Sequence, residues 1–532
     1  MEKKIFYHGF IITMEEKEKS VESVLIEDGI IKAVGELKVV KELAKDAELI
    51  DLGGKTMLPS FIDCHSHIMQ FARILCFTQL NTAKSFAEIK EIITKKLKEE
   101  PENTGWLIGF GYDHNMLKEG EHPDKFLLDE IETKRPILLV HASGHMGCVN
   151  SKGLKLSNIE EGTPDPVGGK IGRVAKSKEP NGYLEESAFM AVAKHMGEIK
   201  IDMEELFEKA QRIYLEYGIT TAQDGFTREE EMKQLDKLNE KNVIKLDVVA
   251  FLDIKENRQV KDQYKNYCKR YDGHLKIGGY KLFLDGSPQG RTAWLTKPYE
   301  EQEGQEKDYC GYPIYTDEQV KEFVAQAKQD EMQLLTHCNG DKAIDQLLNA
   351  TKSPSKMRNV IIHAQTMRRD QLPMVKRLHM IPSYFVAHTF YWGDAHIKNL
   401  GMERASQISP IASTIRESIP YTLHQDTPVI LPNMMETIWC AVNRRTRDGV
   451  LLGEEECISV YDALKAVTVY GAYQYFEEQE KGTISVGKRG DFVVLSDNPF
   501  EVPKEDLRKI QVEQTYKDGE LVYQRKSSSF FL

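Results

Sequence analysis

Histidine, lysine and aspartate residues recur along this chain at positions from which they could hold a metal ion together. The first pair, His65 and His67, lies two residues apart in the segment Phe61-Ile62-Asp63-Cys64-His65-Ser66-His67. Side chains of an extended strand alternate with a period of two, so both imidazoles point to one face and could bind one divalent cation. Four further candidate ligands follow along the chain: Lys281, His337, His363 and Asp426.

Each candidate lies at or near the end of an apolar run typical of a β-strand. The clearest later runs are residues 219–222, 246–251, 281–284, 333–337, 360–363 and 381–387. Strands that alternate with helical stretches predict a parallel sheet. Because the polar residues gather at the carboxyl ends of successive strands, we expect a (β/α)8 TIM barrel. A doubly wound open sheet is the alternative, but no Gly-rich phosphate motif follows the first strand.

The two ends of the chain have a different, strand-rich pattern. Asp28-Gly29 and Asp518-Gly519 each separate two apolar runs, which is a strong hairpin signal. We expect residues 1–58 and 482–532 to form one small β-sandwich domain, with the barrel over residues 59–481. The segment between His67 and Lys281 is longer than the roughly 100 residues that three strand–helix units need. An insertion after the first barrel strand is therefore expected at about residues 70–210, covering the active-site mouth.

Composition limits the classes of partner. The 532 residues carry a net charge of −12, which argues against nucleic acid or an anionic membrane as the main partner. No secretory signal and no apolar run of roughly 20 residues is present. The eight cysteines include no C-x-x-C pair and indicate reduced thiols. We therefore expect a cytoplasmic protein that acts on a small-molecule substrate.

Several longer motifs make the chain resemble the amidohydrolase superfamily, and more closely its amidohydrolase 3 (YtcJ-like) branch of metal-dependent hydrolases. They occupy residues 58–67, 144–146, 182–188, 281–287, 337–341 and 423–428, so the resemblance covers almost the whole length. The His-x-His pair and the terminal Asp426 are typical of the superfamily. The run Lys281-Leu282-Phe283-Leu284-Asp285-Gly286-Ser287 is typical of the branch.

The resemblance assigns a role to each candidate ligand. His65 and His67 would bind the more buried metal, and His337 and His363 a second, more exposed one. Lys281 would be carboxylated by CO2, and its carbamate would bridge two metals. A buried ammonium is costly unless it is paired or neutralised, and carboxylation would replace the ammonium with a carbamate. A salt bridge to Asp285 or an exposed strand end are the alternatives for Lys281.

Asp426 would be both a metal ligand and the general acid/base. Neutral imidazole suits zinc, manganese or iron. We expect zinc, with one or two ions per chain. Further residues are candidates for the substrate pocket, although packing or an ordinary loop contact is the alternative for each: His145, Glu186, Arg291, Tyr391, Trp392 and His424.

The resemblance implies metal-dependent hydrolysis of a C–N bond other than a peptide bond, by metal-bound hydroxide with Asp426 moving the proton. An N-substituted formamide, an N-acyl compound or a cyclic amide would be the substrate. Hydrolytic deamination is an alternative, but superfamily deaminases commonly carry Glu at the place of Gly340. A non-catalytic binding or assembly protein is a second alternative. Because homodimers are common in the superfamily, the resemblance implies a homodimer.

Overall fold

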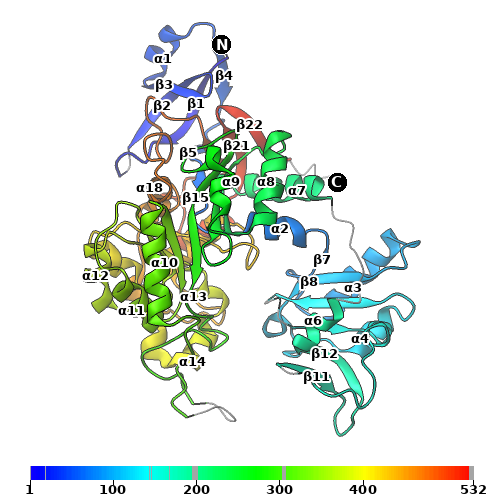
Figure 1. Ribbon diagram of the computed structural model, residues 1–532. Helices are drawn as coiled ribbons and strands as arrows, with labels where there is room; N and C mark the ends of the chain where they lie inside the picture. The colour runs from blue at the N-terminus through cyan, green and yellow to red at the C-terminus, as the bar shows by residue number, and fades with distance from the viewer. Residues whose placement is uncertain are drawn as a thin grey trace. The chain divides into compact units, whose positions relative to one another are not determined.

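The structure is a computed structural model that describes residues 2–17, 19–142, 144, 146–166, 168–193, 202–301 and 307–526. The chain forms two compact units, whose elements are labelled in Figure 1. The main unit comprises Met1–Met69 and Ala210–Leu532, and the inserted unit comprises Gln70–Lys209. Across the described residues, every helix is too short or too polar to cross a bilayer.

Eight strands, all parallel, form the central sheet of the main unit in the order β19-β18-β17-β16-β15-β14-β13-β6. They are β6 (Phe61–Ile62), β13 (Ile219–Thr227), β14 (Asp247–Asp253), β15 (Leu275–Phe283), β16 (Gln333–Cys338), β17 (Val360–His363), β18 (Ile381–Tyr384) and β19 (Thr422–Leu423). Backbone hydrogen bonds from Asp426 N to His65 O (3.2 Å) and from His67 N to Thr427 O (2.7 Å) join the segments that follow β19 and β6. The sheet thus curls into a TIM-like barrel.

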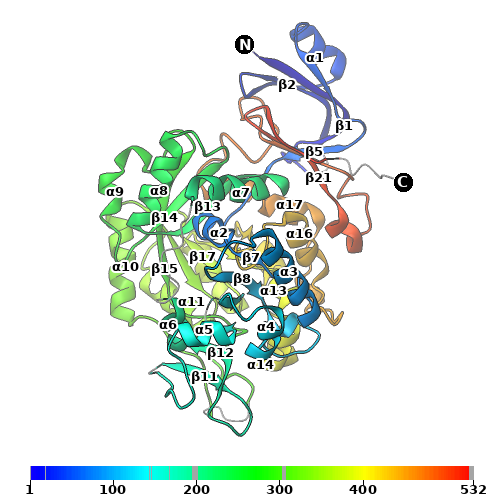
Figure 2. The same cartoon turned by 90° about the vertical axis from the view of Figure 1, so that its right-hand side faces the viewer.

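Amphipathic helices cover the outside of these strands, as Figure 2 shows for α8, α9 and α10 beside β13, β14 and β15. In α10 a capping box of Thr316 and Gln319 satisfies the first backbone N–H groups, and Val320, Val324 and Ala327 form the buried face. The helices of this unit are α8 (Glu229–Glu240), α9 (Val260–Gln263), α10 (Asp317–Gln329), α11 (Asp341–Ala350), α12 (Leu372–Arg377), α13 (His388–Tyr391), α14 (Gly393–Ala405), α15 (Ile411–Arg416), α16 (Met434–Asn443), α17 (Val460–Ala466) and α18 (Val469–Gln474), with 3-10 turns η2 (Lys265–Tyr267), η3 (Arg369–Gln371), η4 (Glu454–Glu456) and η5 (Lys504–Lys509). Two helices cross the sequence boundaries between the units, α2 (Ile68–Ile74) and α7 (Met203–Glu216).

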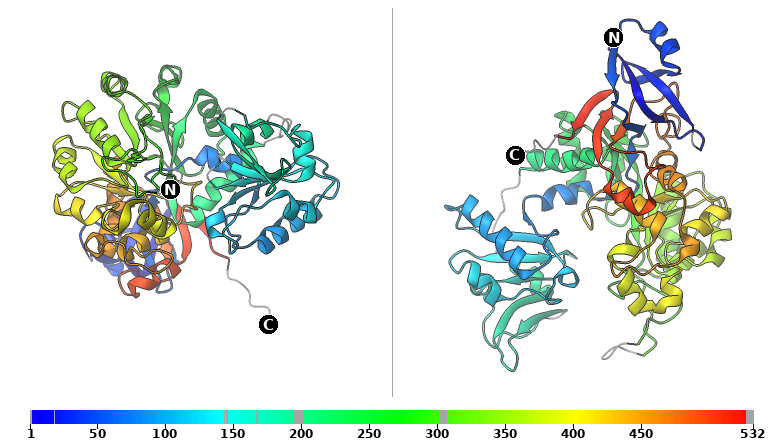
Figure 3. Two further views of the ribbon diagram at one scale, coloured as in Figure 1. Left: turned by 90° about the horizontal axis from the view of Figure 1, so that it is seen from below. Right: turned by 180° about the vertical axis from the view of Figure 1, so that it is seen from behind.

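Strands from both ends of the chain share a second sheet, of order β22-β21-β20-β5-β1-β2-β3, with β4 paired to β1. Figure 3 shows the red C-terminal strands beside the blue N-terminal ones. The bounds are β1 (Lys3–Ile12), β2 (Ser20–Glu27), β3 (Ile30–Gly35), β4 (Glu48–Asp51), β5 (Thr56–Pro59), β20 (Phe492–Leu495), β21 (Val512–Lys517) and β22 (Glu520–Gln524), with helix α1 (Leu37–Leu43). Both Asp-Gly hairpins are confirmed, and each turn has positive φ at both residues, as a type I′ turn requires. The sandwich arrangement stays a prediction.

The inserted unit has a six-stranded sheet of order β11-β12-β10-β9-β8-β7. Its strands are β7 (Thr78–Gln79), β8 (Leu107–Tyr112), β9 (Ile137–His141), β10 (Met146–Val149), β11 (Gly169–Arg173) and β12 (Pro180–Glu186). Its helices are α3 (Phe86–Glu99), α4 (Lys125–Ile131), α5 (Ser151–Leu156) and α6 (Ser187–Ala193), with the 3-10 turn η1 (His114–Met116). β7, β8 and β9 are parallel, whereas β9, β10, β12 and β11 are antiparallel neighbours.

A buried ionic cluster connects the amino end of barrel strand β14 to the C-terminal strands. Asp247 Oδ2 lies 2.6 Å from Lys481 Nζ and 3.2 Å from Lys517 Nζ. Asp247 Oδ1 lies 2.8 Å from His274 Nδ1. Burial alone would raise the pKa of Asp247, but Lys481 and Lys517 outweigh it and hold the pKa well below its usual range.

Replacing Asp247 with Asn is expected to lower the free energy of unfolding of the main unit by about 3–5 kcal/mol, because two lysines lose a buried partner. The sign of the pH effect follows from the depressed pKa. The stabilisation is complete above the unfolded pKa of about 4 and is lost as the pH falls below it, so wild type should weaken more steeply than D247N in acid. Urea unfolding measured across pH 3–7 checks this. Asp46→Asn, at the exposed pair with Lys3, should leave the midpoint unchanged.

Candidate metal centre

The barrel brings the sequence-predicted ligands and His424 together at the carboxyl ends of its strands, and these residues form the barrel site. His65 and His67 follow β6, and His424 and Asp426 follow β19. Lys281 lies on β15, His337 on β16 and His363 at the end of β17. Since parallel strands end at one edge of a barrel, residues from separate parts of the chain converge there.

The first donor group is built around one carboxylate oxygen. Asp426 Oδ1 lies 3.4 Å from His65 Nε2 and 3.3 Å from His67 Nε2. Lys281 Nζ lies 3.0 Å from His65 Nε2. Two donors of a tetrahedral zinc ion with bonds near 2.0–2.1 Å are separated by about 3.3–3.4 Å. The spacing therefore matches that of ligands to one ion.

The second donor group comes from the next two strands. His363 Nε2 lies 3.8 Å from Asp426 Oδ2, and the His337 and His363 ring centroids are 4.6 Å apart. His337 Nε2 lies 3.2 Å from Gly286 O and 3.0 Å from Asn339 Nδ2, which leaves Nδ1 as its available nitrogen. Asp426 thus lies between the two groups of histidines.

One buried atom tests whether these residues fit a metal. Asp426 Oδ1 is buried and accepts no hydrogen bond from the described residues, although an unpaired buried carboxylate oxygen is costly. Among the described residues, His65, His363 and Asp426 also offer three ligand atoms within 4.8 Å of one another. The donor set of imidazoles and a carboxylate fits a divalent cation such as zinc.

Neighbouring side chains fix which nitrogen His65 and His363 present to the site. Gln223 Oε1 lies 2.6 Å from His65 Nδ1, so Nδ1–H donates to it and Nε2 keeps its lone pair for the site. His424 Nε2 lies 3.1 Å from His363 Nδ1, and His424 Nδ1 lies 2.8 Å from Ser383 Oγ. His424 therefore orients His363 in the same way.

Burial sets the charge states of the site. It lowers the pKa of Lys281 to about 7, so the amine is substantially neutral at pH 8. Burial, together with the Lys281 charge, lowers the pKa of His65 well below its usual range and that of His337 to about 4. Neutral imidazoles are the form that binds metals.

Asp426 is held ionised. Burial would raise its pKa, but the contact with His67, together with His424 and Lys281, outweighs burial and lowers it. Asp426 has φ 56° and His363 has φ 71°, a left-handed backbone that costs free energy for non-glycine residues. Two members of the site thus adopt strained conformations that the surrounding fold must maintain.

Neither alternative for Lys281 agrees with the structure. The side chain is fully buried, so the exposed strand end is wrong. Asp285 accepts hydrogen bonds from the backbone N–H groups of Trp294, Asn339 and Gly340, and within the described residues it forms no ion pair with Lys281.

Of the other predicted pocket residues, Arg291, Tyr391 and Trp392 contact partners that are not members of the barrel site. Tyr391 donates to Glu436 Oε1 (2.5 Å), and the Trp392 ring lies 5.9 Å from that of Phe385. Arg291 donates to Glu300 O (2.7 Å) and covers the Tyr299 ring. Glu186 ends β12 in the inserted unit, and His145 lies outside the described residues.

Sequence reasoning missed Gln223 and a second histidine pair. His388 Nδ1 lies 3.0 Å from His396 Nε2, and Phe385 contacts both His388 (4.7 Å between centroids) and His424 (5.5 Å). The signal for His388 was present, because it directly follows a predicted barrel strand. Gln223 follows residues 219–222 at the spacing of an inward-facing residue, but the amide gave no chemical signal of its own.

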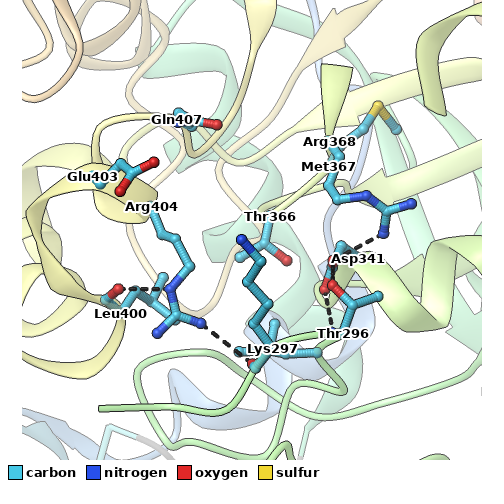
Figure 4. Close-up of a pocket in the computed structure, with 11 residues that line it drawn as sticks. Thr296, Lys297, Asp341, Thr366, Met367, Arg368, Leu400, Glu403, Arg404 and Gln407 are labelled. Carbon is cyan, nitrogen blue, oxygen red and sulfur yellow. Dashed lines mark hydrogen bonds and ion pairs between the residues drawn. The ribbon is translucent and has the colours of Figure 1, made fainter. Parts of the chain in front are cut away.

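A separate pocket, shown in Figure 4, lies between the start of α11, the start of η3 and helix α14. Both arginines of this pocket already donate hydrogen bonds to protein atoms. Arg368 Nη1 donates to Asp341 Oδ2 (2.9 Å), and Arg404 Nε donates to Leu400 O (2.7 Å). None of the predicted site residues lines this pocket, so it is not the candidate catalytic centre.

The profile of the Amidohydrolase family matches residues 48–523, which include every member of the barrel site. The chain belongs to the amidohydrolase family. It is therefore a hydrolase, and the resemblance inferred from the motifs is confirmed.

Relatives of this amidohydrolase match over nearly the full length. YtcJ of Bacillus subtilis strain 168, a putative amidohydrolase by name, is 27% identical, with 98% of this chain and 100% of that protein covered. The N-substituted formamide deformylase of Arthrobacter pascens is 26% identical, with 97% of each chain covered. An uncharacterised metal-dependent hydrolase from Pyrococcus furiosus has a TM-score of 0.73 at 25% identity, over 94% of this chain and 100% of that one. These similarities support dependence on a divalent metal.

Proposed function

We propose that this amidohydrolase hydrolyses a C–N bond of an amide-like small molecule at the barrel site. The observation that carries the proposal is the buried Asp426 Oδ1, which accepts no hydrogen bond from the described residues and lies 3.3–3.4 Å from both His65 Nε2 and His67 Nε2. A carboxylate held ionised beside imidazole nitrogens is suited both to binding a cation and to accepting a proton.

The residues would divide the work as follows. His65, His67, His337, His363, Asp426 and the carbamate of Lys281 would hold one or two divalent ions, zinc being the expected metal. A bound divalent metal acidifies water and polarises a carbonyl oxygen. Asp426 would accept the proton of the attacking water and return it to the leaving nitrogen, while Gln223 and His424 keep His65 and His363 in the required tautomers.

The carbamate requires a neutral amine and CO2. Lys281 Nζ would form a bond to the carbon of CO2 and release one proton, giving a carboxylate-ended side chain. The lowered pKa of Lys281 supports this reaction, because only the unprotonated amine is a nucleophile. The product anion would also remove the cost of a buried ammonium.

The substrate class we favour is an N-substituted formamide or a related N-acyl or cyclic amide. A relative covering 97% of this chain is named an N-substituted formamide deformylase. Deamination has less support, because Gly340 at the start of α11 has no side chain that could protonate a ring. A scaffold without catalysis is also less well supported, because every predicted ligand is present at the site.

Turnover of a panel of N-substituted formamides, N-acyl amines and cyclic amides tests the proposal. We expect release of the amine from at least one class, loss of activity after chelation and dialysis, and recovery with zinc, cobalt or manganese. Turnover that survives complete removal of metal would contradict the metal-dependent mechanism. Release of ammonia from an aminated ring, without amide hydrolysis, would identify a deaminase instead.

A further inference from the structure

A second cluster of metal-ligand side chains lies in the inserted unit. Asp113 and His114 directly follow β8, and His141 is the last residue of β9. β8 and β9 are parallel neighbours, with Tyr112 in register with His141. The carboxyl ends of two parallel strands meet at one edge of a sheet, so the fold itself places these three side chains together.

The three donor atoms form a nearly regular triangle. His114 Nδ1 lies 3.3 Å from His141 Nε2. Asp113 Oδ1 lies 3.5 Å from His141 Nε2 and 3.8 Å from His114 Nδ1. Ligands of tetrahedral zinc are about 3.3–3.4 Å apart, so contraction by a few tenths of an ångström would bring all three into coordination.

Local contacts restrict the orientation of these side chains. The turn η1 holds the backbone through hydrogen bonds from Met116 N to Asp113 O (2.9 Å) and from Leu117 N to His114 O (3.3 Å). The His122 ring stacks on His114 at 4.0 Å, and Tyr112 Oη lies 3.1 Å from His122 Nδ1. The site is therefore largely preformed, which reduces the entropy lost on binding.

The donor types and exposure indicate the ion. Two imidazole nitrogens with one carboxylate oxygen favour zinc and similar transition metals over calcium or magnesium, which prefer oxygen ligands. The side chains of Asp113 and His114 are 17% and 28% exposed, so an ion could enter from solvent. His141 is buried.

We propose that Asp113, His114 and His141 form a second transition-metal site, which binds one zinc-like divalent ion. This site uses none of the barrel-site residues, so a test of it is independent of the proposed function.

Metal stoichiometry of the full-length, tag-free protein tests the proposal. Protein loaded with zinc, desalted and measured by elemental analysis should lose one equivalent on His114→Ala or Asp113→Asn. The matched control is His8→Ala, which removes an exposed histidine that pairs with Asp51 in another sheet and should lose none. A double variant of the barrel site, His65→Ala with His363→Ala, should retain the equivalent that His114→Ala removes.

The variants distinguish coordination from folding. Far-UV circular dichroism should be unchanged in H114A, and added zinc should raise the Tm of wild type more than that of H114A. If D113N and H114A bind as much zinc as wild type, the three side chains form only a hydrogen-bonded cluster and the proposal is wrong. The proposal is equally wrong if the barrel double variant binds no zinc at all.

Discussion

Asp426→Asn should lower kcat by about 10²- to 10⁴-fold, the usual contribution of a positioned general acid/base. Asparagine keeps the shape of the side chain, but its amide cannot accept and return a proton at this position. The histidines and Lys281 remain, so most of the bound metal should remain as well. Steady-state kinetics on a substrate found in the amide panel, with metal content measured on the same samples, checks this result.

The matched control for Asp426 is another aspartate at the carboxyl end of a barrel strand. Asp253 ends β14, and its carboxylate accepts from the backbone N–H groups of Lys255 and Glu256 rather than facing the histidines. Asp253→Asn should therefore leave kcat close to that of wild type. Wild-type turnover in D426N would show that the proton transfer has been assigned to the wrong residue.

Most of the barrel could be predicted because its signal is local. An apolar run with a polar residue at its carboxyl end requires only neighbouring residues, and this identified β14, β16, β17 and β18 as well as most of the ligand candidates. The bounds were less accurate. The prediction ended β13 at Ala222 because the polar residues Gln223 and Asp224 interrupt the apolar pattern. The strand continues to Thr227, since both side chains are buried and form hydrogen bonds.

The end of β18 shows the opposite error. The run 381–387 predicted a longer strand, but β18 ends at Tyr384, since the chain turns at Phe385 into α13 and His388 N bonds to Phe385 O (3.2 Å). Hydrophobicity cannot distinguish a buried strand from a buried turn. That turn is also what places His388 against Phe385 beside the site.

Side-chain contacts between distant parts of the chain could not be predicted from local pattern. Gln223 reaches His65 across 158 residues of chain, and Lys481 reaches Asp247 across 234. An amide or a lysine in an apolar context indicates that a partner must exist, but only the fold selects it. Arg291 illustrates the same limit, because its guanidinium bonds to a loop carbonyl instead of facing the barrel site.

In a His114→Ala background, which removes the second proposed site, Lys281→Ala is expected to lower the metal content from about two equivalents to one or fewer, because the barrel site would lose one of its ligands. Lys281→Met provides the matched variant, since it fills the buried volume without an amine, and it should lose metal equally. Wild-type protein prepared with ¹³C-bicarbonate should show a carbamate carbon in its NMR spectrum that both variants lack. Lys276→Ala, at a buried lysine of the same strand that pairs with Glu477, should keep its metal. One equivalent in the His114→Ala background, unchanged by Lys281→Met, would instead establish a mononuclear barrel site in which Lys281 serves only packing.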